Sequence, residues 1–523
     1  MKITMVFPDW VDPEATIEHN KEGYGIGHHS FAVAALSAEL KQRGHEVDLL
    51  HICYEPDEAS FKDRLREHSH SDMFAFSFTE VEKSWVGGMN RWIKEELGVY
   101  TIGGGTYPTL QPEAALMNLG LDAVCVGEGD YAFPKLADAM DAGRDYKGIR
   151  NLWFRDGDSI IQNERSEIVE DLDTTPRYDL ELFDPTRLKT LVSNLPRLYY
   201  LCTRNCTFGC AFCANHAKRN AYRVGNRFVR RFSPGRVIDD LKYFLEVFPQ
   251  VKVVHFADEV IHQDKDWFRE LMERYRAEIA MPWRSYAMLK LLDQETIEIM
   301  ANSYCTRVNC GVEAGSPRIR KIYNRPPMTD EEIVSKIAMV KSHGIDIHTS
   351  TLLNAPTETL DEMVATIKLA ARANTDIAVT GIVVPYEGTR LNEIAREEGV
   401  LDQTAYENQG VSIIPADTTK EKVVFLYHAY RLMVETYKWI YRRPAFAQGP
   451  LMKAADAVFK SKFLPHNLLV DIRKRFFEGK ILNAAYRRVE TKLGRKEKTV
   501  HQGLEESKAW NRNRVKPVCG HQG

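Results

Sequence analysis

The run Cys202-Thr-Arg-Asn-Cys206-Thr-Phe-Gly-Cys210-Ala-Phe-Cys213 is the most informative stretch of this chain. Three of its cysteines, Cys206, Cys210 and Cys213, are separated by three and then by two residues. Iron–sulfur clusters take thiolate ligands, and this spacing lets one short loop bind three corners of a [4Fe–4S] cluster. We expect Cys202 to lie on the strand side of the loop, so the fourth iron is left without a cysteine.

A structural zinc site or a chance group of cysteines is the alternative interpretation. Zinc sites usually show two separated pairs of Cys or His residues, and none is obvious among the nine cysteines of this chain. Cys305 and Cys310 lie within one apparent strand, where we expect burial in the core. We therefore predict an iron–sulfur cluster bound by three cysteines.

Outward from this loop, residues 197–415 alternate short apolar runs with amphipathic segments such as Glu331–Lys341. We expect strands near residues 198–201, 251–256, 284–288, 307–312, 345–352 and 377–384. These six βα units predict a partial TIM-type barrel, in which functional groups project from the carboxyl ends of the strands. The cysteine loop follows the first of these strands directly.

Residues 1–145 show a similar alternation, with strands expected near residues 3–7, 46–50, 73–76, 99–102 and 122–126. This pattern predicts a Rossmann-like parallel sheet whose ligand lies beyond the carboxyl ends of the strands. Glycine at those ends lets the backbone approach a large ligand, although a tight turn needs glycine as well. The candidate binding residues at these ends are Tyr24, Gly25, Ser77, Thr79, Gly103, Gly104, Gly105, Pro108, Thr109, Gly127, Glu128 and Gly129.

Two further regions complete the predicted α/β architecture. Residues 146–196 are predicted to be a linker with a small hairpin that turns at Arg155–Asp158. Residues 416–523 are predicted to be a basic helical region, with 18 Lys and Arg against 7 Asp and Glu between positions 421 and 500, and a disordered tail from about 499. This charge indicates either an anionic partner such as a membrane surface, or a helical cap whose long basic side chains cover the barrel.

The cysteine run resembles the signature of the radical S-adenosylmethionine (SAM) superfamily, including Arg204 and Asn205 before its first ligand and Phe212 before its last. In that superfamily the amino and carboxylate groups of SAM chelate the open iron. The segments Phe256–Val260, Gly311–Ser316, Leu353–Glu358 and Pro385–Thr389 resemble its other strand ends, although Asn354 and Ala355 stand where glycines are common. The resemblance implies cofactor contacts for Phe212, Asp258, Glu259, Glu313, Ser316, Asn354 and Pro356.

Alternative roles stay open for some of these residues. Glu313 would hold the ribose hydroxyls of SAM, or it is a charge that stabilises a helix N-terminus. Asp258 and Glu259 contact SAM or the substrate, or they form a polar strand end.

The segment Gly104–Glu113, followed by Val126–Asp130, resembles the cobalamin-binding domain that precedes many radical SAM cores. The motif Asp-x-His-x-x-Gly, whose histidine ligates cobalt in some of these domains, is absent from the sequence. The resemblance therefore implies cobalamin without a protein histidine ligand. We expect His28, His29 and His51 to be surface or turn residues.

This double resemblance implies an enzyme that uses a [4Fe–4S] cluster, S-adenosyl-L-methionine and cobalamin. Reductive cleavage of SAM gives a 5′-deoxyadenosyl radical, and methylcobalamin then methylates an unactivated carbon or phosphorus of a small-molecule or lipid substrate. An external electron donor similar to flavodoxin or ferredoxin is implied. A non-methylating cyclase, ring-contraction or oxidative enzyme, and a cluster-bearing binding or electron-transfer protein, are the alternatives.

Composition limits the remaining possibilities. The chain has 523 residues, a net charge of −3 and 27% charged residues, so we expect about three domains and no nucleic-acid partner. It contains no apolar run of the roughly 18 residues that a membrane span requires, and it opens on a strand pattern instead of a signal peptide. An odd number of cysteines argues against a disulfide framework. We expect a cytoplasmic protein, with peripheral membrane contact as an alternative.

Overall fold

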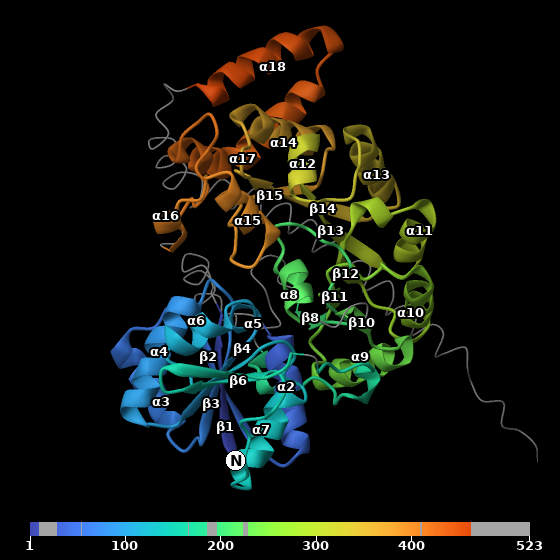
Figure 1. The fold of residues 1–523 in the computed structure, drawn as a ribbon. Helices are drawn as coiled ribbons and strands as arrows, with labels where there is room; N and C mark the ends of the chain where they lie inside the picture. Colours follow the sequence, from blue (N-terminus) through green and yellow to red (C-terminus); the bar gives the residue numbers. More distant parts are fainter. Residues whose placement is uncertain are drawn as a thin grey trace, which may run out of the picture.

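The computed structural model describes residues 1–9, 29–53, 55–165, 167–185, 196–222, 228–407 and 410–461. Two sheets dominate it: a seven-stranded sheet of order β2-β1-β3-β4-β5-β6-β7 and a six-stranded sheet of order β15-β14-β13-β12-β11-β8. Figure 1 shows the first sheet with its helices below and the second sheet above, with the last helices at the far end. The predicted α/β class, with a parallel N-terminal sheet followed by a second parallel sheet, is confirmed.

Five of the seven strands of the first sheet are parallel, and helices cover both faces of this parallel part. The strands are β1 (Lys2–Pro8), β2 (Glu46–Ile52), β3 (Met73–Ser77), β4 (Tyr100–Gly104) and β5 (Ala123–Cys125). The helices are α2 (Phe31–Gln42), α3 (Glu58–Glu67), α4 (Lys83–Glu96), α5 (Thr106–Leu110), α6 (Pro112–Met117) and α7 (Ala132–Asp141). Met5 packs with α2 and α7 on one face, whereas Val6 packs with α3 and α4 on the other. Burial on both faces explains why these strands are apolar throughout.

The predicted hairpin is formed by β6 (Leu152–Asp156) and β7 (Ser159–Gln162), with its turn at Gly157. It does not stand apart from the first sheet, because β6 pairs antiparallel with β5. The segment that follows contributes Tyr178, Leu180 and Phe183 to a core shared with the second sheet. The domain boundaries themselves stay a prediction.

Six parallel strands form the second sheet, an open barrel with β8 and β15 at its edges. The strands are β8 (Arg197–Tyr200), β11 (Val253–Phe256), β12 (Trp283–Ala287), β13 (Cys305–Glu313), β14 (Asp346–Leu353) and β15 (Ile377–Ile382). The helices are α8 (Ala214–Tyr222), α9 (Pro234–Val247), α10 (Lys265–Glu278), α11 (Gln294–Asn302), α12 (Pro317–Ile322), α13 (Asp330–Ser342), α14 (Leu360–Arg372), α15 (Arg390–Glu397) and α16 (Gln403–Glu407). Phe256 and Trp283 pack against each other on the face that meets α10.

Two long helices, α17 (Lys420–Tyr441) and α18 (Ala445–Lys460), follow the barrel. Helix α17 packs on β15 and α14, and the Tyr430 hydroxyl lies 2.9 Å from the Thr351 hydroxyl. This part of the C-terminal region therefore caps the barrel edge. Among the described residues, no helix combines the length and apolarity needed to cross a bilayer.

Candidate functional site

A cavity of about 510 Å³ lies where the carboxyl ends of the first sheet meet the cysteine loop. Of the sequence-predicted residues, it is lined by Ser77, Thr79, Gly103, Gly104, Gly105, Gly127, Glu128, Gly129 and Glu259. Tyr24 and Gly25 lie outside the described residues. Pro108 and Thr109 are buried in α5 instead, and the Thr109 hydroxyl accepts a hydrogen bond from the Gly127 amide at 3.2 Å. Thr109 thus supports the loop that lines the cavity.

Two adjacent glycines at the end of β4 serve different purposes. Gly105 has φ = 100°, and a Cβ there would lie 2.6 Å from the Phe78 carbonyl oxygen, so the turn requires glycine. A Cβ at Gly104, by contrast, would meet no atom closer than 3.9 Å. Since Gly104 lines the cavity, it leaves open a space that a side chain would fill.

The cysteine loop lies between β9 (Thr203–Arg204), which pairs with β10 (Arg230–Arg231), and α8. Cys206 and Cys213 are partly buried and Cys210 is buried. Burial raises the pKa of the Cys206 thiol to about 11 and also raises that of Cys213, and in both cases Cys210 adds to the effect. Because iron binds thiolates, cluster assembly here must release protons.

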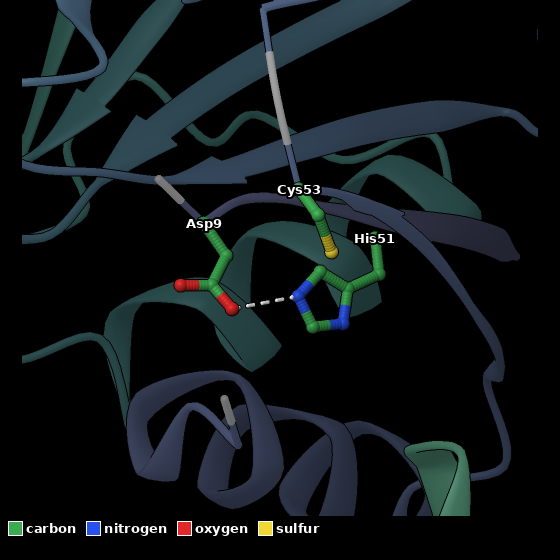
Figure 2. A group of neighbouring side chains, drawn as sticks. All are labelled: Asp9, His51 and Cys53. Carbon is green, nitrogen blue, oxygen red and sulfur yellow. Dashed lines mark hydrogen bonds and ion pairs between the residues drawn. The ribbon is translucent and has the colours of Figure 1, made fainter. Parts of the chain in front are cut away.

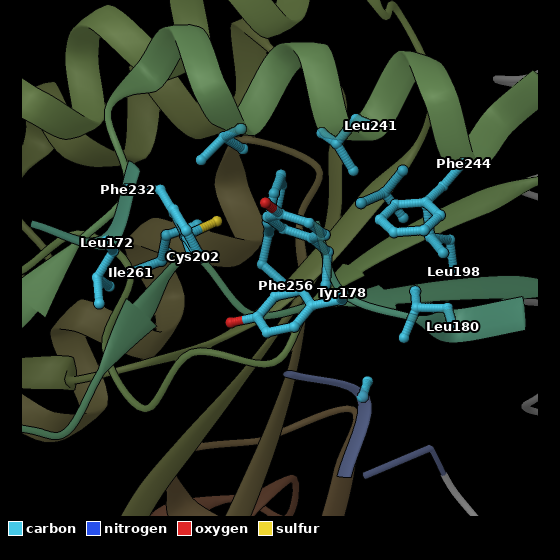
Figure 3. Close-up of a cluster of buried hydrophobic side chains, with 14 of the residues drawn as sticks. Leu172, Tyr178, Leu180, Leu198, Cys202, Phe232, Leu241, Phe244, Phe256 and Ile261 are labelled. Atoms are coloured by element: carbon cyan, nitrogen blue, oxygen red, sulfur yellow. The ribbon is translucent and has the colours of Figure 1, made fainter. Parts of the chain in front are cut away.

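Cys202 lies in the core and is fully buried. Figure 3 shows its side chain within the cluster of buried apolar side chains that includes Phe232 and Ile261, and burial raises the pKa of its thiol well above the usual range. Cys305 and Cys310 are also buried, within β13, as expected. The geometry therefore separates these three cysteines from the three of the loop.

The acidic pair after β11 is divided between core and cavity. Asp258 is fully buried, burial raises its pKa to about 6, and its carboxylate accepts the Cys202 amide at 3.1 Å. Glu259 is exposed, lines the cavity and accepts a hydrogen bond from Asn215 Nδ2 at 2.7 Å. Only Glu259 of the two is positioned to contact a ligand in the cavity.

Glu313 ends β13 with φ = 68°, and its carboxylate folds over Gly311. A Cβ at Gly311 would lie 2.0 Å from Glu313 Oε1, so a side chain here would displace the Glu313 carboxylate. Burial raises the pKa of Glu313 to about 7, and Arg325 opposes that rise. Arg325 donates to the Gly311 carbonyl at 2.6 Å and to the Cys210 sulfur at 3.1 Å. Arg325 thus links the cysteine loop to Glu313.

The other residues predicted to contact SAM have partners within the protein. The Ser316 hydroxyl accepts the Ile319 amide at the start of α12 and donates to Glu362 at 2.7 Å. Asn354 is buried with φ = 68°, a conformation that asparagine tolerates better than most residues, and it donates to the Ile413 carbonyl. Pro356 is buried in the same turn, and Phe212 packs edge-on against Tyr323. Their contacts with SAM stay a prediction.

Ion pairs join the glycine loop after β5 to the barrel. Arg204 donates to both carboxylate oxygens of Asp130, at 2.8 and 2.9 Å, and Arg230 donates to Glu128 at 3.0 Å. All four side chains are largely buried. The carboxylate of Glu128, predicted to bind a cofactor, is thus engaged by Arg230.

His51 is not the surface or turn residue that we expected. It is buried in β2, and its Nε2 lies 3.0 Å from Asp9 Oδ2 (Figure 2). The ligand atoms of Asp9, His51 and Cys53 all lie within 4.8 Å of one another. His29 is partly buried with its ring 4.9 Å from Phe183, and His28 lies outside the described residues.

Sequence reasoning missed three residues of α8, Asn215, Lys218 and Tyr222, which line the cavity together. Their spacing of three and four residues places them on one face of the helix that follows Cys213. This spacing could have identified them as neighbours from the sequence alone. Arg325 gave no such signal, because it lies in a loop more than a hundred residues from Cys210.

Residues 200–370 match the Radical SAM superfamily, and residues 24–137 match the B12 binding domain. Together the two matches cover more than half of the chain. The chain thus contains a radical SAM domain and a B12-binding domain. Its cofactor set is therefore the one predicted: a [4Fe–4S] cluster, SAM and cobalamin.

Curated relatives and solved structures agree with this assignment. The chain is 28% identical over 307 residues to an uncharacterized methyltransferase of Pyrococcus horikoshii, covering 58% of this chain and 64% of the relative. It is 24% identical to the cytidylyl-2-hydroxyethylphosphonate methyltransferase of Streptomyces wedmorensis, covering 62% of this chain and 67% of the relative. The chain thus spans about two thirds of the length of these relatives.

The cobalamin-dependent SAM radical enzyme OxsB, solved with aqua-cobalamin and SAM bound, shares the fold. The TM-score is 0.62 at 14% identity, and the match covers 99% of this chain and 82% of that one. At this identity the likeness concerns the fold alone.

The residues of this radical SAM chain fit the cofactors of its family. One loop supplies three thiols. Arg325 donates a charged hydrogen bond to the sulfur of one of them, Cys210, and cysteine sulfurs that bind a cluster accept hydrogen bonds of this kind. Gly104 has no side chain and so leaves room at the cavity wall. The walls are largely aromatic and apolar, and they include Phe7, Phe31, Phe76, Phe78 and Phe133. Such walls suit a large, mostly apolar ligand.

Proposed function

We propose that this protein is a cobalamin-dependent radical SAM methyltransferase that methylates an unactivated carbon or phosphorus atom. The observation that carries the proposal is the shared cavity. Gly104 and Gly129 of the first sheet line it together with Asn205, Asn215 and Glu259 of the barrel. Both halves of the chain thus contribute walls to one space, which supports a reaction that uses both sets of cofactors. The methyltransferase names of the two curated relatives support the same conclusion.

When bound, the cluster and SAM supply a carbon-centred radical, and cobalamin supplies a methyl group. The protein's part is to hold these groups and to exclude water. The aromatic walls of the cavity exclude water from one side. Glu259 and Asn215 are joined by a hydrogen bond and offer a polar contact at the cavity wall.

Cofactor content and products test the proposal. The protein is purified without oxygen from cobalamin-fed cells, and iron, sulfide and cobalt are measured. After reduction with SAM present, we expect both 5′-deoxyadenosine and S-adenosylhomocysteine. The deoxyadenosine product without the homocysteine product would favour the non-methylating cyclase or oxidase, and iron without cobalt would overturn the cobalamin assignment.

The expectations about partners belong to the same proposal. An external low-potential donor, similar to flavodoxin or ferredoxin, reduces the cluster, and a small-molecule or lipid substrate receives the methyl group. Exposed Leu432, Trp439 and Phe446 lie near the exposed basic residues Arg442 and Arg443, which supports peripheral contact with an anionic membrane. Vesicle co-sedimentation with and without anionic lipid tests this contact.

A further inference from the structure

Asp9, His51 and Cys53 bring three kinds of metal-binding side chain together at the carboxyl end of the first sheet. Each offers one ligand atom, a carboxylate oxygen, a ring nitrogen or the thiol sulfur, and these three atoms all lie within 4.8 Å of one another. All three residues are buried. The proposed methyl transfer gives them no role, so their grouping calls for a separate explanation.

The pairing of β1 with β2 fixes this grouping. The two strands run parallel with Phe7 opposite His51. The Asp9 amide continues the ladder, because it donates to the Ile52 carbonyl at 2.7 Å. His51 and Cys53 are two residues apart at the end of β2, so their side chains point to the same face. Figure 2 shows the Asp9 carboxylate and the Cys53 sulfur directed toward the His51 ring.

The distances within the group suit a tetrahedral zinc ion. Zinc bonds of about 2.0 Å to nitrogen or oxygen and about 2.3 Å to sulfur place tetrahedral ligand atoms about 3.3–3.6 Å apart. His51 Nε2 lies 3.0 Å from Asp9 Oδ2, and the other separations are within 4.8 Å. Side-chain shifts of about 1 Å therefore close the group around the ion.

The chemistry of the three side chains also suits a divalent ion. Zinc takes carboxylate, imidazole and thiolate ligands, and the group supplies one of each. The carboxylate binds in its ionised form, the imidazole binds as the neutral ring, and the Cys53 thiol releases one proton to solvent as its sulfur bonds the metal. Zn²⁺ with one carboxylate and one thiolate is neutral overall, so the filled site can be buried at low electrostatic cost.

The group lies between an aromatic core and the cavity. The ring centroid of His51 lies 4.9 Å from that of Phe7 and 6.1 Å from that of Phe183. Asp9 and Phe7 also line the cavity that the two halves of the chain share. Three protein ligands leave the fourth position of a tetrahedral zinc ion to water or to a ligand in that cavity.

We propose that Asp9, His51 and Cys53 bind one zinc ion at the edge of the cavity. The site belongs to the first sheet and is separate from the cysteine loop that follows β8. It goes beyond the proposed methyl transfer and does not depend on it. A hydrogen-bonded Asp–His pair beside a core cysteine, with no metal, is the alternative that the experiments exclude or establish.

Zinc analysis and X-ray absorption at the zinc edge test the proposal on protein loaded with cluster and cobalamin. One equivalent of zinc chloride is added, and unbound metal is removed by desalting. We expect close to one zinc per chain, with one sulfur at about 2.3 Å and the other ligands nitrogen or oxygen at about 2.0–2.2 Å. Absence of retained zinc overturns the proposal. A spectrum with three sulfurs also overturns it, because it places the zinc in the cysteine loop.

Variants locate the ion. Asp9→Asn and Cys53→Ala should each lower the retained zinc at least fivefold. Cys125→Ala is the matched control, since Cys125 is another buried free cysteine and lines the same cavity, and it should retain zinc as wild type does. Iron content, cobalt content and circular dichroism check that the variants fold, and Cys53→Ser replaces a Cys53→Ala protein that does not. Wild-type zinc content in folded Asp9→Asn and Cys53→Ala proteins, or equal loss in Cys125→Ala, contradicts the assignment.

Discussion

Cys202 and Cys206 are four positions apart, yet only one of them is accessible to a cofactor. The chain passes from β8 into the β9 turn at Cys202, whose amide is held by Asp258, and this places its sulfur in the core. Cys206 lies beyond the turn and is partly buried beside Cys210. Whether a cysteine of this run can reach a cofactor thus depends on its position relative to the end of the strand.

Replacing Cys206, Cys210 or Cys213 with alanine should abolish cluster assembly and SAM cleavage, because each is predicted to supply a thiolate to the cluster. Cys202→Ala should retain iron and activity and lose only about 1 kcal/mol of stability from its core position. Iron and sulfide analysis with 5′-deoxyadenosine detection checks this. Equal iron loss in all four variants would refute the ligand assignment.

Gly104→Leu should expel cobalamin while iron content stays normal. A Cβ at Gly104 meets no atom closer than 3.9 Å, so the backbone tolerates the change and the side chain enters the cavity. The control is Gly148→Leu, since Gly148 has no atom within 4 Å of an added Cβ and does not line the cavity. Cobalt retained by the Gly104 variant would show that cobalamin binds elsewhere.

Arg325→Gln should retain the cluster and lower its reduction potential, on the order of tens of millivolts. The guanidinium lies 3.1 Å from the Cys210 sulfur, where its charge would stabilise the reduced, more negative state of a cluster bound there. Redox titration followed by electron paramagnetic resonance measures the shift. Arg325→Lys keeps the charge and should restore most of the potential; an unshifted Arg325→Gln cluster contradicts a direct electrostatic role.

At the scale of elements, the turn from β14 into α14 holds its shape through its own polar groups. Asn354 takes the left-handed conformation that glycine would otherwise supply, and the Ala355 amide donates to Glu358 at 2.8 Å. Burial raises the pKa of Glu358 to about 8. The altered sequence of this turn thus retains a defined conformation.

The Glu358 carboxyl should make the protein less stable as the pH rises. The folded state holds this proton up to about pH 8, whereas the unfolded chain releases it near the ordinary value of 4.5, so stability falls between these values. The glutamine of Glu358→Gln stays neutral at every pH. Between pH 6 and pH 8, the free energy of unfolding of this variant should therefore fall by roughly 2 kcal/mol less than that of wild type. Urea unfolding of the apoprotein at both values measures the difference. Exposed Glu393→Gln is the control, and identical slopes for Glu358→Gln and wild type would contradict the prediction.

At the scale of the whole molecule, the two sheets behave as one packed unit. A single apolar core contains Met5 and Phe133 of the first half as well as Phe232 and Trp283 of the second. The Arg204–Asp130 and Arg230–Glu128 pairs fix the glycine loop on the barrel beside this core. The cavity depends on that docking, because its walls come from both halves.

Glu128→Gln should destabilise the protein by about 3 kcal/mol and reduce cobalamin occupancy, because it leaves Arg230 buried without its partner charge. The double variant Glu128→Gln/Arg230→Met removes both charges and should recover most of the loss. Thermal unfolding and cobalt content of the single and double variants measure the coupling. Additive losses would mean that the pair does not hold the loop.

Sequence patterns predicted both sheets, and most of the described binding residues predicted for the first sheet do line the cavity, but the environment of particular residues was not predicted. We expected His51 to be a surface or turn residue, because the sequence around it does not indicate the Asp9 carboxylate that it contacts in the fold. Glu128 lines the cavity and its cofactor contact stays a prediction, but nothing near it in the sequence indicates its ion pair with Arg230. In both cases the partner is distant along the chain, so the local sequence does not indicate it.

By itself, the sequence determined the alternation of strands and helices, the two parallel sheets and the cysteine loop that follows a strand. Each of these depends on periodicity or spacing within a few residues, which local hydrophobicity and loop length control. Only the tertiary structure decided that Arg325 bonds Cys210, that Arg204 bonds Asp130, and that Arg230 bonds Glu128. These groupings join residues from separate elements, and the packing of whole sheets brings them together.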